Sequence, residues 1–157
     1  MRIFESVLRN CSLIYFAAAE DSDAFSVTIA ESSLLLGLGE VVPFSEAHIN
    51  VGGHVNMLTH SYTCPLDAIY EFRLHVHTEQ LLQRSARLAI EVNDVIVAEV
   101  FAQDDDFEAT AATSVIQACT AGMMVKVLGY QPLSEVQGRG FLVFSGKLLT
   151  TNAGIIK

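Results

Sequence analysis

The sequence contains no tryptophan, three prolines and few charged residues, which make up 17% of its 157 residues. Basic residues are especially scarce, because nine Lys and Arg stand against 18 Asp and Glu, for a formal net charge of −9. Phosphate backbones and anionic lipids repel such a chain, which argues against direct nucleic-acid binding. A membrane span needs roughly 18 or more continuous apolar residues. The best uncharged stretch, residues 109–125, is diluted by threonine, serine and glutamine, which argues against membrane insertion.

Signatures of catalysis are also absent. The sequence has no Gly-x-Ser-x-Gly, and its ten glycines form no phosphate-binding loop. Cys11, Cys64 and Cys119 show no Cys-x-x-Cys spacing, and an odd number completes no disulfide framework. Neither Cys64 nor Cys119 has the basic neighbours that favour a thiolate, so we expect free buried thiols. The sequence therefore predicts a protein that is not an enzyme.

Apolar residues, in contrast, are abundant, at 51% of the chain with a mean hydropathy of +0.39. A soluble domain usually has about a quarter charged residues. Because a small β-domain has limited core volume, the apolar surplus predicts burial between subunits.

Short apolar runs separated by polar turns predict an all-β chain. Residues 70–76 alternate, with Tyr70 and Phe72 on one face and Glu71 and Arg73 on the other. Residues 87–101 predict a hairpin whose turn is Asn93-Asp94, since these residue types tolerate positive φ. Further strands are expected at 25–29, 34–38, 44–50, 111–119, 124–128 and 141–149.

The first 23 residues are predicted to form an N-terminal appendage, followed by a globular domain over residues 24–157. Residues 11–19 are apolar and end in three alanines, which resembles a weak signal peptide with a cleavage site. Glu5 and Arg9 argue against that interpretation, so cleavage is left open.

Five motifs then occur along the chain. Phe44 begins a run that ends at Asn50 before Gly52-Gly53, and residues 62–72 read Tyr-Thr-Cys-Pro-Leu-Asp-Ala-Ile-Tyr-Glu-Phe. Asn93 lies in the central hairpin, residues 109–122 form a strand ending in glycine, and residues 144–149 read Phe-Ser-Gly-Lys-Leu-Leu. Together, over about residues 24–150, they resemble the globular-head family of complement component 1q, which shares its jelly roll with tumour necrosis factor cytokines.

The resemblance implies a ten-stranded jelly-roll β-sandwich that assembles as a compact homotrimer. It places the structural core at Phe44, Tyr70, Phe72, Phe144 and Gly146. Ala68 stands where the family has glycine, so the backbone there must avoid positive φ. Met123 and Lys147 replace a family Asp and Phe, which identifies a divergent member, and residues 101–108 resemble the cerebellin group.

The densest set of hard oxygen ligands comprises Asp104, Asp105, Asp106 and Glu108. Calcium takes six to eight oxygens, and neighbouring carboxylates supply several of them. In calcium-binding relatives the acidic ligands lie in this same loop, so a calcium site is predicted here. The alternative is a solvated acidic turn, and it is favoured by Ala109, which stands where relatives have a further Asp.

Histidines form a second candidate set. His48, His54 and His60 recur at six-residue intervals, while His75 and His77 share one strand face. Such residues bind zinc or sense pH. No acidic or thiol partner lies at a ligand spacing, which favours ordinary polar strand faces.

Two functional classes follow from the resemblance. The first is a secreted, soluble innate-immune pattern-recognition protein that binds carbohydrate or charged ligands on a cell or microbial surface. The second is a signalling or adhesion ligand that binds a cell-surface receptor, as cerebellins and cytokines do. The chain contains no collagen-like tract, which favours the first class, and the sequence does not identify the ligand-binding residues.

Overall fold

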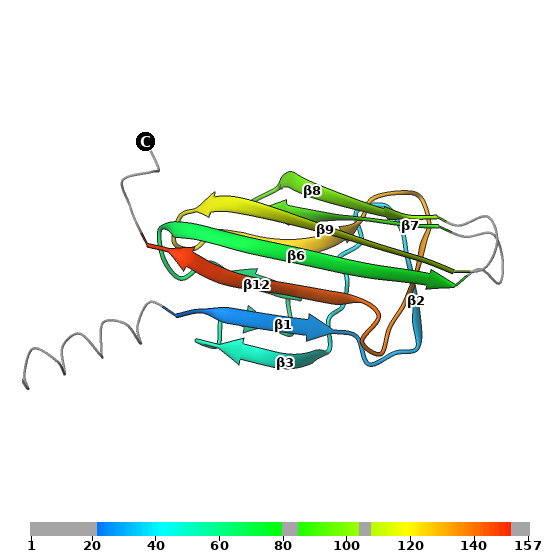
Figure 1. The fold of residues 1–157 in the computed structure, drawn as a ribbon, viewed down its shortest axis with the longest axis horizontal. Helices are drawn as coiled ribbons and strands as arrows, with labels where there is room; N and C mark the ends of the chain where they lie inside the picture. The colour runs from blue at the N-terminus through cyan, green and yellow to red at the C-terminus, as the bar shows by residue number, and fades with distance from the viewer. Residues whose placement is uncertain (1–21, 80–84, 104–107, 152–157) are drawn as a thin grey trace, which may run out of the picture.

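The computed structural model describes residues 22–79, 85–103 and 108–151 of the chain. These residues form two five-stranded sheets and one two-stranded sheet, in which every neighbouring pair of strands is antiparallel. In spatial order, sheet 1 consists of β3 (Glu46–Val51), β1 (Ala24–Thr28), β12 (Val143–Thr150), β6 (Ala68–Glu79) and β9 (Glu108–Cys119), which lie side by side in Figure 1.

Sheet 2 packs behind sheet 1 in the view of Figure 1. It consists of β4 (Val55–Asn56), β5 (Ser61–Thr63), β10 (Met124–Gly129), β7 (Ala86–Val92) and β8 (Val95–Ala102). The all-β sandwich is therefore confirmed, with ten strands in the two large sheets. Strand β2 (Ser33–Leu36) overlaps the strand expected at residues 34–38, but β11 (Ser134–Gln137) and its pairing with β2 were not expected. The pair contributes buried Leu36 and Val136 to the core.

Strand β6 is an interior strand of sheet 1 because it pairs with β12 on one side and with β9 on the other. Tyr70 and Phe72 are 0% exposed and Leu74 is 1% exposed, while Glu71 and Arg73 point to the opposite face. The predicted alternation along residues 70–76 is present in the structure. One face of β6 therefore packs in the core, and the other face points away from sheet 2.

The core is joined across the two sheets by aromatic rings. Phe25 of sheet 1 stacks on Tyr62 of sheet 2 with ring centroids 4.4 Å apart, and its ring meets Phe144 edge-on at 5.1 Å. Gly146 is required at this point, because a Cβ atom there would lie only 2.8 Å from Cδ1 of Phe72. Phe44 is also buried, so all five residues assigned to the core lie inside the sandwich.

The β7–β8 hairpin forms around the predicted turn. Asn93 and Asp94 have φ values of 48° and 65°, the left-handed conformation that a tight primed turn requires. The Asn93 side chain also accepts a hydrogen bond from the Met124 backbone N–H at 3.2 Å. Ala68 begins β6 and pairs with Cys119 in the sheet, and it is not among the residues with positive φ.

Phe72→Ala should lower the free energy of unfolding by about 3–5 kcal/mol, because it opens a cavity among packed rings that cannot close around it. Thermal or denaturant unfolding measures the change. Leu58→Ala is the matched control, since Leu58 is 92% exposed and its loss should have little effect. Equal stabilities of the two variants would contradict the strand register of β6.

Candidate functional site

The outward face of sheet 1, on the side away from sheet 2, combines exposed aliphatic side chains with shallow hollows. We call it the open face. Strand register and alternation assign it the following side chains: Ala24, Ser26, Ile49, Val51, Glu71, Arg73, His75, Ala112, Ser114, Ile116, Val143, Ser145 and Lys147.

Small side chains flank Arg73 along the middle row of the open face. One row of partners crosses the sheet from Ile49 through Ser26, Ser145 and Arg73 to Ser114. Because serines and alanines leave space above the backbone, two shallow hollows of about 370 and 240 Å³ adjoin there, with Arg73 and Ser145 lining both. The centre therefore has low surface on either side of the Arg73 side chain.

Aliphatic side chains surround this low centre. Ile116 is 67% exposed, and Ile49 and Val51 are about half exposed. Exposed aliphatic side chains gathered on one sheet face are typical of surfaces that bind protein, since water contact with them is unfavourable.

The charges on the open face are paired. Arg73 donates two hydrogen bonds to Oε1 of Glu71, at 3.0 Å and 2.8 Å, and Lys147 Nζ lies 3.3 Å from Oε2. The hydrogen bonds from Arg73 and then Lys147 hold the pKa of Glu71 below its usual value. Two cations and one carboxylate make this patch slightly positive on a chain whose net charge is −9.

His75 and His77 both project from β6, as predicted, but they differ in exposure. His75 is partly exposed, and its Nδ1 lies 2.9 Å from the carbonyl oxygen of Phe141. His77 is buried because the Phe141 ring stacks on it at 4.9 Å, and its Nδ1 contacts Thr110 Oγ1 at 2.9 Å. His77 is therefore a packing residue rather than part of a polar strand face.

The other histidines are dispersed. His48 lies exposed on β3, and His60 Nδ1 contacts the Phe44 carbonyl oxygen at 2.9 Å. Across residues 22–79, 85–103 and 108–151, no group of three or more His, Cys, Asp or Glu side chains could hold a metal ion. The part of the chain that the structure describes thus gives no support to the zinc alternative.

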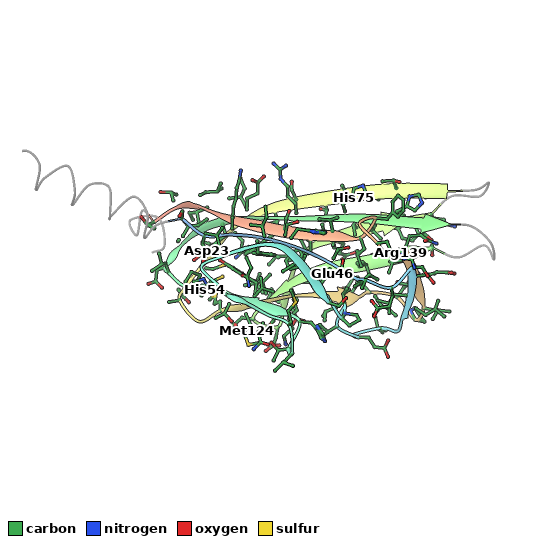
Figure 2. The ribbon with its side chains drawn as sticks, turned by 90° about the horizontal axis from the view of Figure 1, so that it is seen from below. Asp23, Glu46, His54, His75, Met124 and Arg139 are labelled. Carbon is green, nitrogen blue, oxygen red and sulfur yellow. The ribbon has the colours of Figure 1, made fainter. Side chains whose placement is uncertain are left out.

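His54 has an acidic partner that its sequence spacing did not reveal. Its Nδ1 lies 2.5 Å from Oδ2 of Asp23, which is only 7% exposed. Gly52 makes room for this pair, because a Cβ atom at that position would lie 2.7 Å from His54 Nδ1. The pair fixes the entry to β1 at one end of the sandwich, while His75 lies toward the other end (Figure 2).

The predicted calcium ligands cannot be placed. Asp104, Asp105 and Asp106 lie outside the described residues, and Glu108 is the first residue of β9 with a side chain that is not described. The calcium site therefore stays a prediction.

Comparisons with known proteins agree with this architecture. The family model of the C1q domain matches residues 24–149. The globular domain of zebrafish complement 1qA superposes with a TM-score of 0.67 at 17% identity, covering 83% of this chain and 99% of that one. Eiger TNF from S. frugiperda superposes with a TM-score of 0.67 at 7% identity, covering 82% of this chain and 92% of that one.

Murine APRIL gives a TM-score of 0.59 at 7% identity, covering 82% of this chain and 99% of that one. At such identities these likenesses establish the fold, which is the predicted jelly roll shared by complement 1q heads and tumour necrosis factor proteins. The family match extends over most of the chain, and it confirms the resemblance seen in the sequence motifs. This protein belongs to the C1q domain family.

Proposed function

We propose that this protein is a non-enzymatic recognition module that works as a homotrimer and associates through the open face of sheet 1. C1q and TNF-like domains are typically non-enzymatic ligand-binding modules and commonly form homotrimers. The observation that carries the proposal for this chain is the exposure of Ile116, Ile49 and Val51 on one sheet face, around a low centre.

Apolar surface favours this assembly. Each square ångström of apolar surface removed from water contributes about 25 cal/mol, and stable interfaces bury roughly 800 Å² on each partner. The open face is a five-stranded sheet face with exposed aliphatic side chains, so it offers apolar surface for an interface. Burial of this face between subunits also accounts for the excess of apolar residues, which one sandwich core does not absorb.

Charge favours the same face. Three chains with a net charge of −9 each repel one another overall. Around the centre of the open face that repulsion is reduced, because Arg73 and Lys147 both pair with the carboxylate of Glu71.

Ile116→Asp should convert the trimer to monomers, because it buries an unpaired carboxylate in each interface. Light scattering at micromolar concentration should show a mass of three chains, about 51 kDa from 17.1 kDa each, for the unsubstituted protein and of one chain for the variant. Val95→Asp is the matched control, since Val95 is 61% exposed at the β7–β8 hairpin, and it should leave the trimer intact. A light-scattering mass of one chain for the unsubstituted protein would contradict the proposal.

For the ligand, we favour carbohydrate or charged groups on a cell or microbial surface, bound outside the cell by loops of the trimer. C1q-domain proteins are typically secreted or extracellular. No helix among the described residues has the length and apolar character needed to cross a bilayer. A receptor-binding role, as a signalling or adhesion ligand, is the alternative that the TNF-like fold keeps open.

One trimer preparation distinguishes these roles. We expect binding on a glycan array and none in a display screen of cell-surface receptors, with Ile116→Asp monomers as the control for avidity. Receptor binding without glycan binding would replace the first role with the second.

Calcium binding by Asp104, Asp105, Asp106 and Glu108 is a further prediction. Four carboxylates within five residues repel one another, and a divalent cation relieves that repulsion. Calorimetric titration of calcium into chelator-treated protein should give heat, which Asp104→Ala and Asp106→Ala reduce and Glu31→Gln does not. No heat at millimolar calcium would leave a solvated acidic turn.

A further inference from the structure

Two cysteine thiols meet inside the sandwich, although 54 residues separate Cys64 from Cys119 in the sequence. Cys64 directly follows β5 of sheet 2, and Cys119 is the last residue of β9 in sheet 1. Both are free thiols, and their residues are 0% and 1% exposed. The pair therefore spans the two layers of the fold.

The backbone holds Cys64 against the turn that follows Cys119. The Cys64 N–H donates to the Met123 carbonyl at 2.9 Å, and the Gly122 N–H donates to the Cys64 carbonyl at 2.8 Å. Cys119 is held in turn by its sheet pairing with Ala68. These three backbone interactions position the side chains of Cys64 and Cys119 near each other, independently of any contact between the sulfur atoms.

The side-chain interaction between the two thiols raises the pKa of Cys64, with burial adding to the effect, and it lowers the pKa of Cys119. A lowered pKa favours the thiolate of Cys119, and the thiolate is the species that attacks disulfides.

We propose that Cys64 and Cys119 form a redox site that closes to an intramolecular disulfide between sheet 1 and sheet 2. The oxidant is a small-molecule disulfide such as oxidised glutathione. The Cys119 thiolate attacks it, forms a mixed disulfide and releases one thiolate; Cys64 then loses its proton and attacks the Cys119 sulfur, releasing the second. Two electrons and two protons pass from the cysteine pair to the oxidant, which leaves as two thiols.

Burial determines when this exchange takes place. An external disulfide reaches Cys119 only when the turn at residues 120–123 opens, so the reaction proceeds through local opening rather than at the folded surface. Once formed, the bond closes a long loop and ties the end of β9 to the start of the β5–β6 connection. Such a cross-link restricts the unfolded chain and raises stability.

The experiment uses the full chain with Cys11→Ser, so that only the two buried cysteines remain. The protein is incubated with a mixture of reduced and oxidised glutathione, then denatured in acid, alkylated and weighed by mass spectrometry. We expect a loss of about 2 Da with no alkylation, and a melting midpoint about 10 °C above that of the reduced form. The same chain with Cys119→Ala should show neither change.

Full alkylation of both cysteines after the incubation, or glutathione adducts in place of a cross-link, would overturn the proposal. The mass measurement on the Cys11→Ser protein decides this even if Cys119→Ala does not fold. The same incubation of the protein that retains Cys11, followed by mass spectrometry of its proteolytic peptides, checks which cysteines pair. A disulfide-linked peptide that joins Cys11 to Cys64 or Cys119 would also contradict the proposed Cys64–Cys119 bond.

Discussion

The alternation of side chains along β6 is the constraint on which the rest of the structure depends. Tyr70 and Phe72 point inward and are completely buried, whereas Glu71 and Arg73 point outward between β12 and β9. A shift of one residue in this register would exchange the two sets. The same strand therefore determines both the aromatic core and the charged centre of the open face.

The core and the open face are consequently two sides of one sheet. Phe25, Phe72 and Phe144 fill the inner side, and Gly146 on β12 leaves the space that their rings require. On the outer side the same strands carry small residues, so the sheet is low at its centre and aliphatic at its margins. The proposed assembly would therefore use the outer side of the same strands whose inner side forms the core.

Local patterns in the sequence were sufficient for much of the fold. The period of two along β6, the Asn93-Asp94 turn and the order of the motifs each depend on neighbouring residues or on a family pattern. They predicted the sandwich, located the core and indicated β2, but not β11 or its pairing with β2, since the two strands are short and lie about 100 positions apart.

The side-chain contacts at the candidate sites depend instead on residues that lie far apart in the sequence and meet only in the folded protein. Asp23 and His54 are separated by 31 positions and meet because Gly52 makes room, and Cys64 meets Cys119 through the β9–β10 turn. The burial of His77 depends on Phe141, which follows much later in the chain. No spacing rule contains this information, because each contact joins segments that lie far apart in the sequence.

The central claim is that the open face of sheet 1 joins copies of this chain, and a crystal structure of the purified protein tests it most directly. The account predicts three copies around a threefold axis, with Ile116 and Ile49 buried between them and the Glu71–Arg73 pair retained inside the interface. A crystal in which this face lies against solvent, or in which the copies meet through sheet 2, would contradict it.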